Sequence, residues 1–210
     1  ELRPVRLYLK LNVEEDRILA DFTGTSPQAP GPSNVGPGLL PAGVFSVAKS
    51  FLDPEGEINH GSLRPIQVTA PTGTLVNCRL PAPCGGSGEV LYTMDAVAMG
   101  AIAPALEGRV TGDIKGGANH VYVGGIDPST GDPFVFYEYP AAGVGAFHGD
   151  DGNNVARNYY ESDITSMQPI EAVEQKFPLR IEQFGLREDS GGDGQWRGGL
   201  GCRRAVRVLS

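Results

Sequence analysis

Histidine and cysteine are scarce in this sequence of 210 residues, which has three of each. The cysteines, Cys78, Cys84 and Cys202, are odd in number and form no CxxC pair, a pattern more typical of a reduced cytoplasmic protein than of a disulfide scaffold. Positive charge is also limited, and the formal net charge of -8 disfavours nucleic-acid and anionic-membrane partners. Neither a signal peptide nor an apolar run long enough to span a bilayer is present. We therefore expect a soluble, cytoplasmic protein.

Glycine and proline, in contrast, are abundant, with 30 and 17 residues. They are spread along the whole chain without a collagen-like period, which predicts many tight turns rather than a low-complexity tail. The remaining composition, 40% hydrophobic and 20% charged, is that of a globular protein. The length suits one large domain or two small ones.

Alternating apolar and polar residues, the pattern of half-buried strands, recur along the chain. Two such segments, 5–12 and 18–22, flank a polar turn and predict a hairpin. A second hairpin is predicted at 121–125 and 134–139, because the loop between these segments is rich in Asp, Pro, Ser and Gly. Further strands are predicted at 63–70 and around 191–201.

Apolar residues at helical spacing predict two longer helices and a short one. The first covers 40–51, and the second follows a glycine-rich turn and covers 87–105, with Ser87 as its N-cap. The short helix is expected over 169–177, between two prolines. Because strands and helices are mixed without regular alternation, the predicted class is α+β, with mixed, mainly antiparallel sheets, two or three packed helices and many Gly/Pro-rich turns.

The best candidates for chemistry lie in and before a polar loop. Glu138 ends a predicted strand, and His148 and Asp151 follow in a glycine-rich segment. A carboxylate beside an imidazole can act as a base or orient one, as amide hydrolysis or carbanion formation requires. The same residue types also favour ordinary polar turns, so a structural loop is the competing and more frequent interpretation. His120, at the mouth of the second hairpin, is another candidate, with a structural role as its alternative.

The glycine clusters do not form a nucleotide-binding motif. No GxxxxGK[ST] sequence occurs, and residues 143–149 miss the GxGxxG spacing by one residue. Gly85–Gly88 precedes a helix and could present backbone N–H groups to an anion, but a tight turn is the favoured interpretation. For 191–201 we favour a structural turn with Trp196 packed across its glycines. We assign no cofactor-binding residue and no metal ligand in this chain.

Four stretches, taken in order, resemble a single family: Asp21–Gln28, Leu63–Ile66 with Ala70-Pro71, Pro169–Glu174 with Pro178, and Asp189–Gly194 with Arg197–Gly201. Together they resemble the hydantoinase B/oxoprolinase family, which includes the B-type subunits of N-methylhydantoinases and 5-oxoprolinases. The large subunits of acetone and acetophenone carboxylases are its relatives. The resemblance implies that residues 1–210 are the C-terminal region of a B-type subunit, a fragment of a longer polypeptide or assembly.

The resemblance also implies a function, namely part of a multi-subunit, ATP-dependent hydrolase that opens a hydantoin, oxoproline or lactam ring. ATP would be bound by a hydantoinase A-like partner subunit or domain. A divalent metal ion would be bound by the N-terminal half of the B-type subunit, outside this segment. The alternatives are a subunit of an acetone/acetophenone-type carboxylase, which takes a small ketone, and a non-catalytic assembly module. Convergence of Glu138, His148 and Asp151 in a pocket or at a subunit interface would favour catalysis, whereas their separation in solvent would favour the module.

Overall fold

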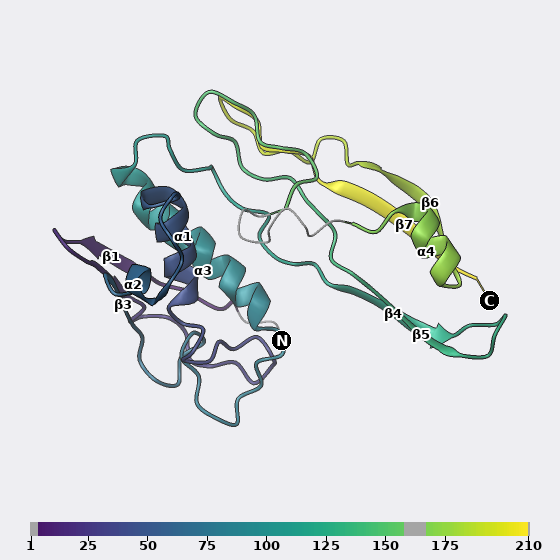
Figure 1. The fold of residues 1–210 in the computed structure, drawn as a ribbon, viewed down its shortest axis with the longest axis horizontal. Coiled ribbons are helices and arrows are strands. Elements are labelled where there is room, and N and C mark those ends of the chain that lie inside the picture. The colour runs from purple at the N-terminus through teal and green to yellow at the C-terminus, as the bar shows by residue number, and fades with distance from the viewer. Residues whose placement is uncertain (1–3, 158–166, 210) are drawn as a thin grey trace. The chain divides into compact units, whose positions relative to one another are not determined.

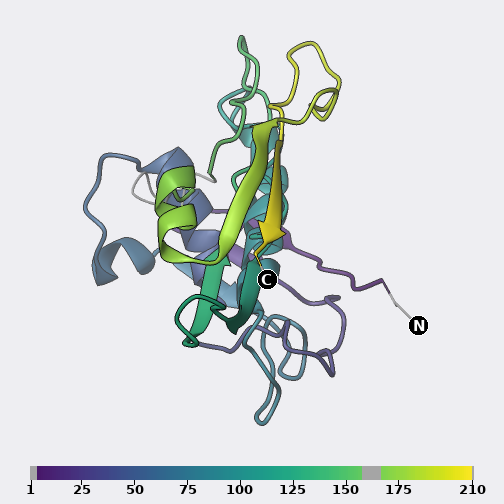
Figure 2. The same ribbon diagram turned by 90° about the vertical axis from the view of Figure 1, so that its right-hand side faces the viewer.

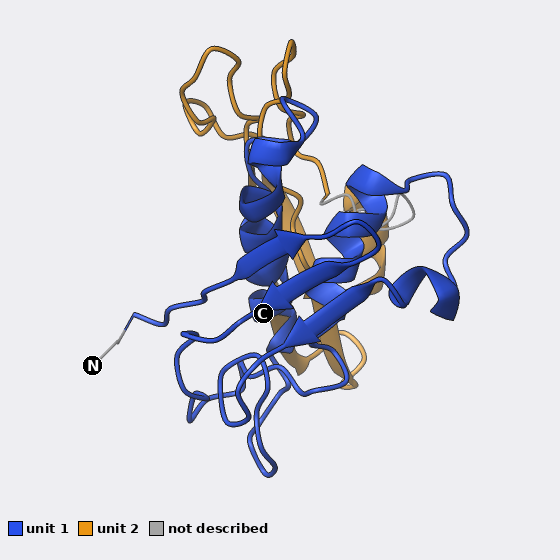
Figure 3. Cartoon of the chain, turned by 90° about the vertical axis from the view of Figure 1, so that its left-hand side faces the viewer, with its two compact units in different colours: residues 1–117 blue, residues 118–210 orange. Residues whose placement is uncertain are grey.

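The computed structural model describes residues 4–157 and 167–209. The chain divides into two compact units, residues 1–117 and 118–210, and both combine helical and strand structure (Figures 1 and 3). This mixture confirms the α+β prediction. No helix within the described residues is long and apolar enough to cross a membrane.

Unit 1 contains a three-stranded sheet in the order β1-β2-β3. Strands β1 (Lys10–Val13) and β2 (Ile18–Asp21) form the predicted antiparallel hairpin. Strand β3 (Ile66–Thr69) pairs with β2 in parallel, because the connection through α1 (Ala42–Leu52) and α2 (His60–Leu63) returns the chain to the same end of the sheet. The sheet is therefore mixed, while both two-stranded sheets of unit 2 are antiparallel.

Two helices, α1 and α3 (Ser87–Ile102, followed by the short η1 at Ala103–Ala105), cover one face of this sheet. Figure 3 shows the strands in front of both helices. The helices meet at Gly43 and Met94, where the missing side chain of the glycine leaves room for a fully buried methionine. The predicted apolar faces of both helices supply much of the core, including Val44, Val47 and Ala98.

The first strand starts later than predicted, although its alternation is correct. Leu7, Leu9 and Leu11 all pack against the core. However, β2 has only four residues, and its register pairs Lys10 with Asp21, so residues 5–9 extend beyond it. Their backbone is bound instead by side chains, for example when the N–H of Tyr8 donates to Thr25 Oγ1 at 3.1 Å.

Two further local predictions were wrong. The strand expected from residue 63 begins at Ile66, because Asn59 and Ser62 form a capping box that starts α2 in this place. Ser87 does not cap α3 but is its first residue, and the cap position belongs to Gly86 without a side-chain hydrogen bond. Gly86 N–H donates to Pro32 O at 2.9 Å, so contact with another segment determines where this helix begins.

In its described residues, 118–157 and 167–209, unit 2 is built from two hairpins and one short helix. Strands β4 (Val121–Ile126) and β5 (Pro133–Glu138) form the second predicted hairpin, and β6 (Leu179–Leu186) pairs with β7 (Cys202–Val208). Helix α4 (Ile170–Lys176) precedes β6 and packs against it (Figure 2). A small core joins these elements and contains Phe136, Val173, Leu179 and Ile181.

Substitution of Gly43 tests the contact between α1 and α3. A Cβ atom at position 43 would lie 2.8 Å from Met94 Cβ, so Gly43→Ala should lower the free energy of unfolding by about 1–3 kcal/mol. Gly100→Ala is the matched control, because a Cβ on this exposed position of α3 meets no atom within 4 Å. The control should be neutral or stabilise by up to about 1 kcal/mol. Urea unfolding of the protein that carries this chain measures both, and equal effects would contradict the close packing.

Candidate functional site

The β4–β5 hairpin separates a buried face from an open one. In its register Val123 lies opposite Phe136, and both belong to the core of unit 2. Tyr122 and Tyr137 form the adjacent pair and therefore point to the other face. They are 66% and 39% exposed, so the open face carries the accessible groups of this hairpin.

Four rings gather on the open face and form an aromatic cluster of His120, Tyr122, Tyr137 and Tyr139. The rings of Tyr122 and Tyr137 stack with centroids 4.7 Å apart. His120 lies with its ring centroid 5.7 Å from those of Tyr137 and Tyr139. The guanidinium of Arg157 lies 4.3 Å from the centroid of the Tyr139 ring, in the geometry of a cation–π contact.

A hydrogen bond within this cluster joins His120 to Tyr137. His120 Nδ1 lies 2.7 Å from the hydroxyl oxygen of Tyr137. Burial raises the pKa of Tyr137, and the neighbouring Tyr122 and Tyr139 add to the effect. The phenol therefore stays protonated near neutral pH, and its hydrogen bond with Nδ1 fixes the orientation of the imidazole ring. An oriented imidazole is the group that general acid–base chemistry most often uses.

Glu138 lies in a different environment, on the buried side of the hairpin. Its Oε1 is 3.1 Å from Arg204 Nη1, and both side chains are more than nine-tenths buried. The same oxygen accepts from the backbone N–H of Gln168 at 3.1 Å, and Arg204 Nη2 donates to Gln168 O at 3.0 Å. Glu138 is therefore a member of a buried structural network, in which Arg204 Nε has no hydrogen-bond partner among the described residues.

His148 and Asp151 lie in the predicted polar loop and contact the segment 191–201. The rings of His148 and Trp196 meet edge to face with centroids 4.9 Å apart. Asp151 Oδ1 accepts from the backbone N–H of Arg197 at 2.7 Å, and its other oxygen lies 3.8 Å from Arg197 Nε. Both side chains are exposed.

Glycines allow these two segments to approach backbone to backbone. Gly199 N–H donates to Val144 O at 2.9 Å. A Cβ atom at Gly143 would overlap the carbonyl of Gly199, and one at Gly199 would overlap that of Asn153. These contacts support the structural interpretation of 191–201.

The structure brings together only part of the predicted constellation. His148 and Asp151 share the loop layer with 191–201, whereas Glu138 is bonded to Arg204 and Gln168. Across the described ranges, neither a hydrogen bond nor an ion pair joins Glu138 to His148 or Asp151. A catalytic role for any of the four candidates, His120 included, stays a prediction.

A pocket of ≈ 400 Å³ in unit 2 is lined by the segment after β5 and by residues 187–202. Asn119, Arg187 and Cys202 are among its lining residues. Burial raises the pKa of Cys202, whose thiol donates to Ala141 O at 3.1 Å, so this group stays neutral. Asn119 has a φ of 54°, a left-handed conformation that only a few residue types adopt readily. The volume is that of a small-molecule site.

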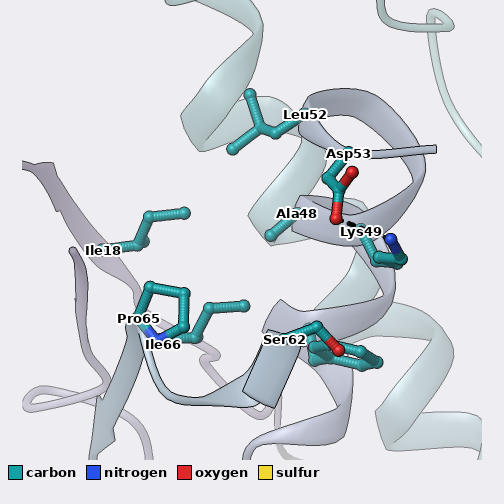
Figure 4. Close-up of a pocket in the computed structure, with 9 residues that line it drawn as sticks. Ile18, Ala48, Lys49, Leu52, Asp53, Ser62, Pro65 and Ile66 are labelled. Atoms are coloured by element: carbon teal, nitrogen blue, oxygen red, sulfur yellow. Dashed lines mark hydrogen bonds and ion pairs between the residues drawn. The ribbon is translucent and has the colours of Figure 1, made fainter. Parts of the chain in front are cut away.

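A second pocket, of ≈ 170 Å³, lies in unit 1 between α1, α2 and the sheet (Figure 4). Ile18, Ala48 and Ile66 give it a largely apolar lining. Lys49 Nζ donates to Asp53 Oδ2 at 2.6 Å at its edge. This ion pair satisfies both charges, so the pocket offers little chemistry beyond apolar contact.

The resemblance implies a divalent metal outside this segment. Residues 4–157 and 167–209 contain no group of three or more His, Cys, Asp or Glu side chains that could hold a metal ion. We therefore assign no metal ligand among these residues.

The three tyrosines and Arg187 were not among the candidates predicted from the sequence. Tyr122, Tyr137 and Tyr139 could have been found, because the predicted hairpin already placed them on one face with His120. Arg187 could not, since it comes near Asn119 only through the fold of unit 2.

Comparison with known proteins gives a consistent family. The family model described as hydantoinase B/oxoprolinase matches residues 2–210. An uncharacterized protein of Methanocaldococcus jannaschii, MJ0963, is 33% identical over 207 residues, which cover 98% of this chain and 35% of that protein. The chain thus spans about a third of the length of this curated relative.

Two solved structures have the same fold. The ATP-dependent caprolactamase from Pseudomonas jessenii superposes with a TM-score of 0.81 and 27% identity, over 96% of this chain and 35% of that one. Nucleotide-free acetone carboxylase gives a TM-score of 0.86 at 20% identity, over 98% of this chain and 28% of that one. At this identity the second likeness concerns the fold alone.

The buried pair of Glu138 and Arg204 can be tested by removing one charge or both. Glu138→Leu should lower the free energy of unfolding by about 3–5 kcal/mol, because it leaves a buried guanidinium without its counter-charge. The double variant Glu138→Leu/Arg204→Met should recover most of this loss. Glu182→Gln is the control, since its partner Arg207 is exposed, and should cost at most about 1 kcal/mol. A double variant as unstable as the single one would contradict this assignment.

Proposed function

The chain belongs to the hydantoinase B/oxoprolinase family, and from this premise we propose that it is part of an ATP-dependent hydrolase that opens cyclic amides. The observation that carries the proposal is the family match over residues 2–210. The likeness to an ATP-dependent caprolactamase, at 27% identity and a TM-score of 0.81, supports it. The substrate class is a hydantoin, oxoproline or lactam ring.

We infer that this chain contributes about a third of a longer B-type subunit, as its share of the relative from M. jannaschii suggests. ATP binds to a hydantoinase A-like partner subunit or domain. There it activates the amide, so that its carbonyl carbon becomes a better electrophile. A divalent metal belongs to the other part of the B-type subunit. The contribution of this chain is then to bind, to orient and to move protons.

Within the chain, His120 is the strongest of the four candidates for proton transfer. Glu138 is engaged by Arg204, whereas His120 has its ring oriented by the hydroxyl of Tyr137 at 2.7 Å. Asn119, its neighbour in sequence, lines the ≈ 400 Å³ pocket together with Arg187. A guanidinium and an amide are suitable donors for the carbonyl or carboxylate of a ring amide and its product.

The runner-up is a subunit of an ATP-dependent ketone carboxylase. The observation in its favour is the acetone carboxylase fold at a TM-score of 0.86. In that reaction the new bond joins two carbons, so a ketone and bicarbonate replace the ring amide. A third interpretation, an assembly module without its own catalytic group, is supported by the structural roles of Glu138 and Asp151.

The first test is substrate-stimulated ATP hydrolysis by the complex purified with this chain, its partners and its metal. Stimulation by hydantoin, 5-oxoproline or a lactam, with release of the ring-opened product, is the expected result. Stimulation only by acetone with bicarbonate would replace the hydrolase with the carboxylase. A complex in which none of these compounds stimulates ATP hydrolysis would contradict both.

The second test compares the three histidines of the chain. If His120 transfers a proton, His120→Gln should lower kcat by about 10²–10⁴-fold, and Tyr137→Phe should cause a smaller loss. His60→Gln is the matched control and should leave kcat within about threefold, because His60 is exposed and is not one of the candidates. His148→Gln tests the other candidate histidine in the same assay. An unchanged kcat in a folded His120→Gln complex would favour the assembly module.

A further inference from the structure

Cys78 and Cys84 bring two thiols together in unit 1. Both cysteines are free, and their Sγ atoms lie 3.4 Å apart. The sulfur atoms of a disulfide are ~2.05 Å apart, so an approach of ~1.4 Å joins them, which is within the reach of side-chain rotation. Cys202 differs, because its thiol contacts the carbonyl of Ala141.

The backbone anchors this thiol pair on both sides of an exposed loop. Cys78 N–H donates to Val35 O at 3.1 Å, and Cys84 O accepts from Ser87 N–H at 3.0 Å. Leu80, between the two cysteines, is 94% exposed. The ends of the loop are therefore held while its middle is open, and the thiols do not need to find each other by diffusion.

The two thiols differ in accessibility. Cys78 is 7% exposed, and burial raises its pKa, with the neighbouring Cys84 adding to this effect. Cys84 is half-buried and adjoins the loop that solvent reaches. Since the thiolate is the form that reacts with oxidants, the more accessible Cys84 reacts first, and Cys78 is the thiol that resolves the product.

We propose that Cys78 and Cys84 form a reversible intramolecular disulfide, with a peroxide as the oxidant. The Cys84 thiolate attacks one oxygen of hydrogen peroxide, the O–O bond breaks, and a sulfenic acid and hydroxide result. The Cys78 sulfur then attacks the Cys84 sulfur and displaces its oxygen, which leaves as water with the Cys78 proton. In total, two thiols and one peroxide give one disulfide and two waters, and the two sulfurs supply the two electrons that reduce the O–O bond.

The cross-link closes the segment 78–84, which leads into α3. Cys84 lies three positions before Ser87, the first residue of this helix. Oxidation therefore constrains the entry to α3 and the exposed loop at Leu80, and a dithiol reductant reverses the change by exchange. The proposal concerns unit 1 alone and does not rest on the proposed function.

Peptide mapping of the oxidised protein tests the proposal. The reduced protein that carries this chain is treated with hydrogen peroxide, alkylated in denaturant and digested with trypsin. Cleavage after Arg79 separates the two cysteines into peptides 50–79 and 80–109. These peptides should be recovered as one linked species that dithiothreitol separates, and the number of alkylated cysteines in the chain should fall from three to one.

Single-cysteine variants assign the link. Cys202→Ser should leave the linked species intact, with none of the remaining cysteines alkylated. Cys84→Ser should abolish it and keep Cys78 alkylatable, whereas Cys78→Ser should leave Cys84 as a sulfenic acid that dimedone traps. Unlinked Cys78 and Cys84 after peroxide treatment, whether alkylated or overoxidised, would overturn the proposal, as would a link to Cys202.

Discussion

The buried ion pair between Glu138 and Arg204 is the contact on which unit 2 depends. It joins the end of β5 to β7, which belong to different sheets, and Gln168 binds both partners from the segment before α4. Two charges that leave water are stabilised only when their geometry and remaining hydrogen bonds are nearly complete. This requirement favours one arrangement of the two hairpins. The end of β5, from which the following segment continues, is therefore held in a defined place relative to β7.

The orientation of Glu138 also determines the chemistry of the hairpin. Successive side chains of a strand point to opposite faces, so an inward Glu138 turns Tyr137 and Tyr139 outward. On the outer face these rings meet His120, and the phenol of Tyr137 orients the imidazole. Glu138, which the sequence suggested as a base, is therefore engaged in a structural contact with Arg204. It helps to position the strand end that carries Tyr137, whose hydroxyl contacts His120.

Local patterns in the sequence were enough to predict most of the helices and strands, but they predicted few of the contacts between them. Alternation predicted both early hairpins, and helical spacing predicted α1 and α3. The partner of Glu138 could not be read from the sequence, because Arg204 is 66 positions away. The proximity of Cys78 and Cys84 was also missed, since their spacing matches no known motif and depends on how Val35 and Ser87 hold the loop.

Family membership and chemistry are carried by different residues of this chain. The segment 189–201, one of the long motifs behind the resemblance, contacts 143–153 backbone to backbone at Gly199, where a Cβ atom would overlap the carbonyl of Asn153. Such a motif reports on the fold, because no other residue type satisfies that geometry. The open face of the hairpin has no comparable constraint, since its side chains project outward and can differ without disturbing the core. Differences between ring hydrolases and ketone carboxylases should therefore be sought on such open faces and pocket walls, and not at close backbone contacts such as that of Gly199.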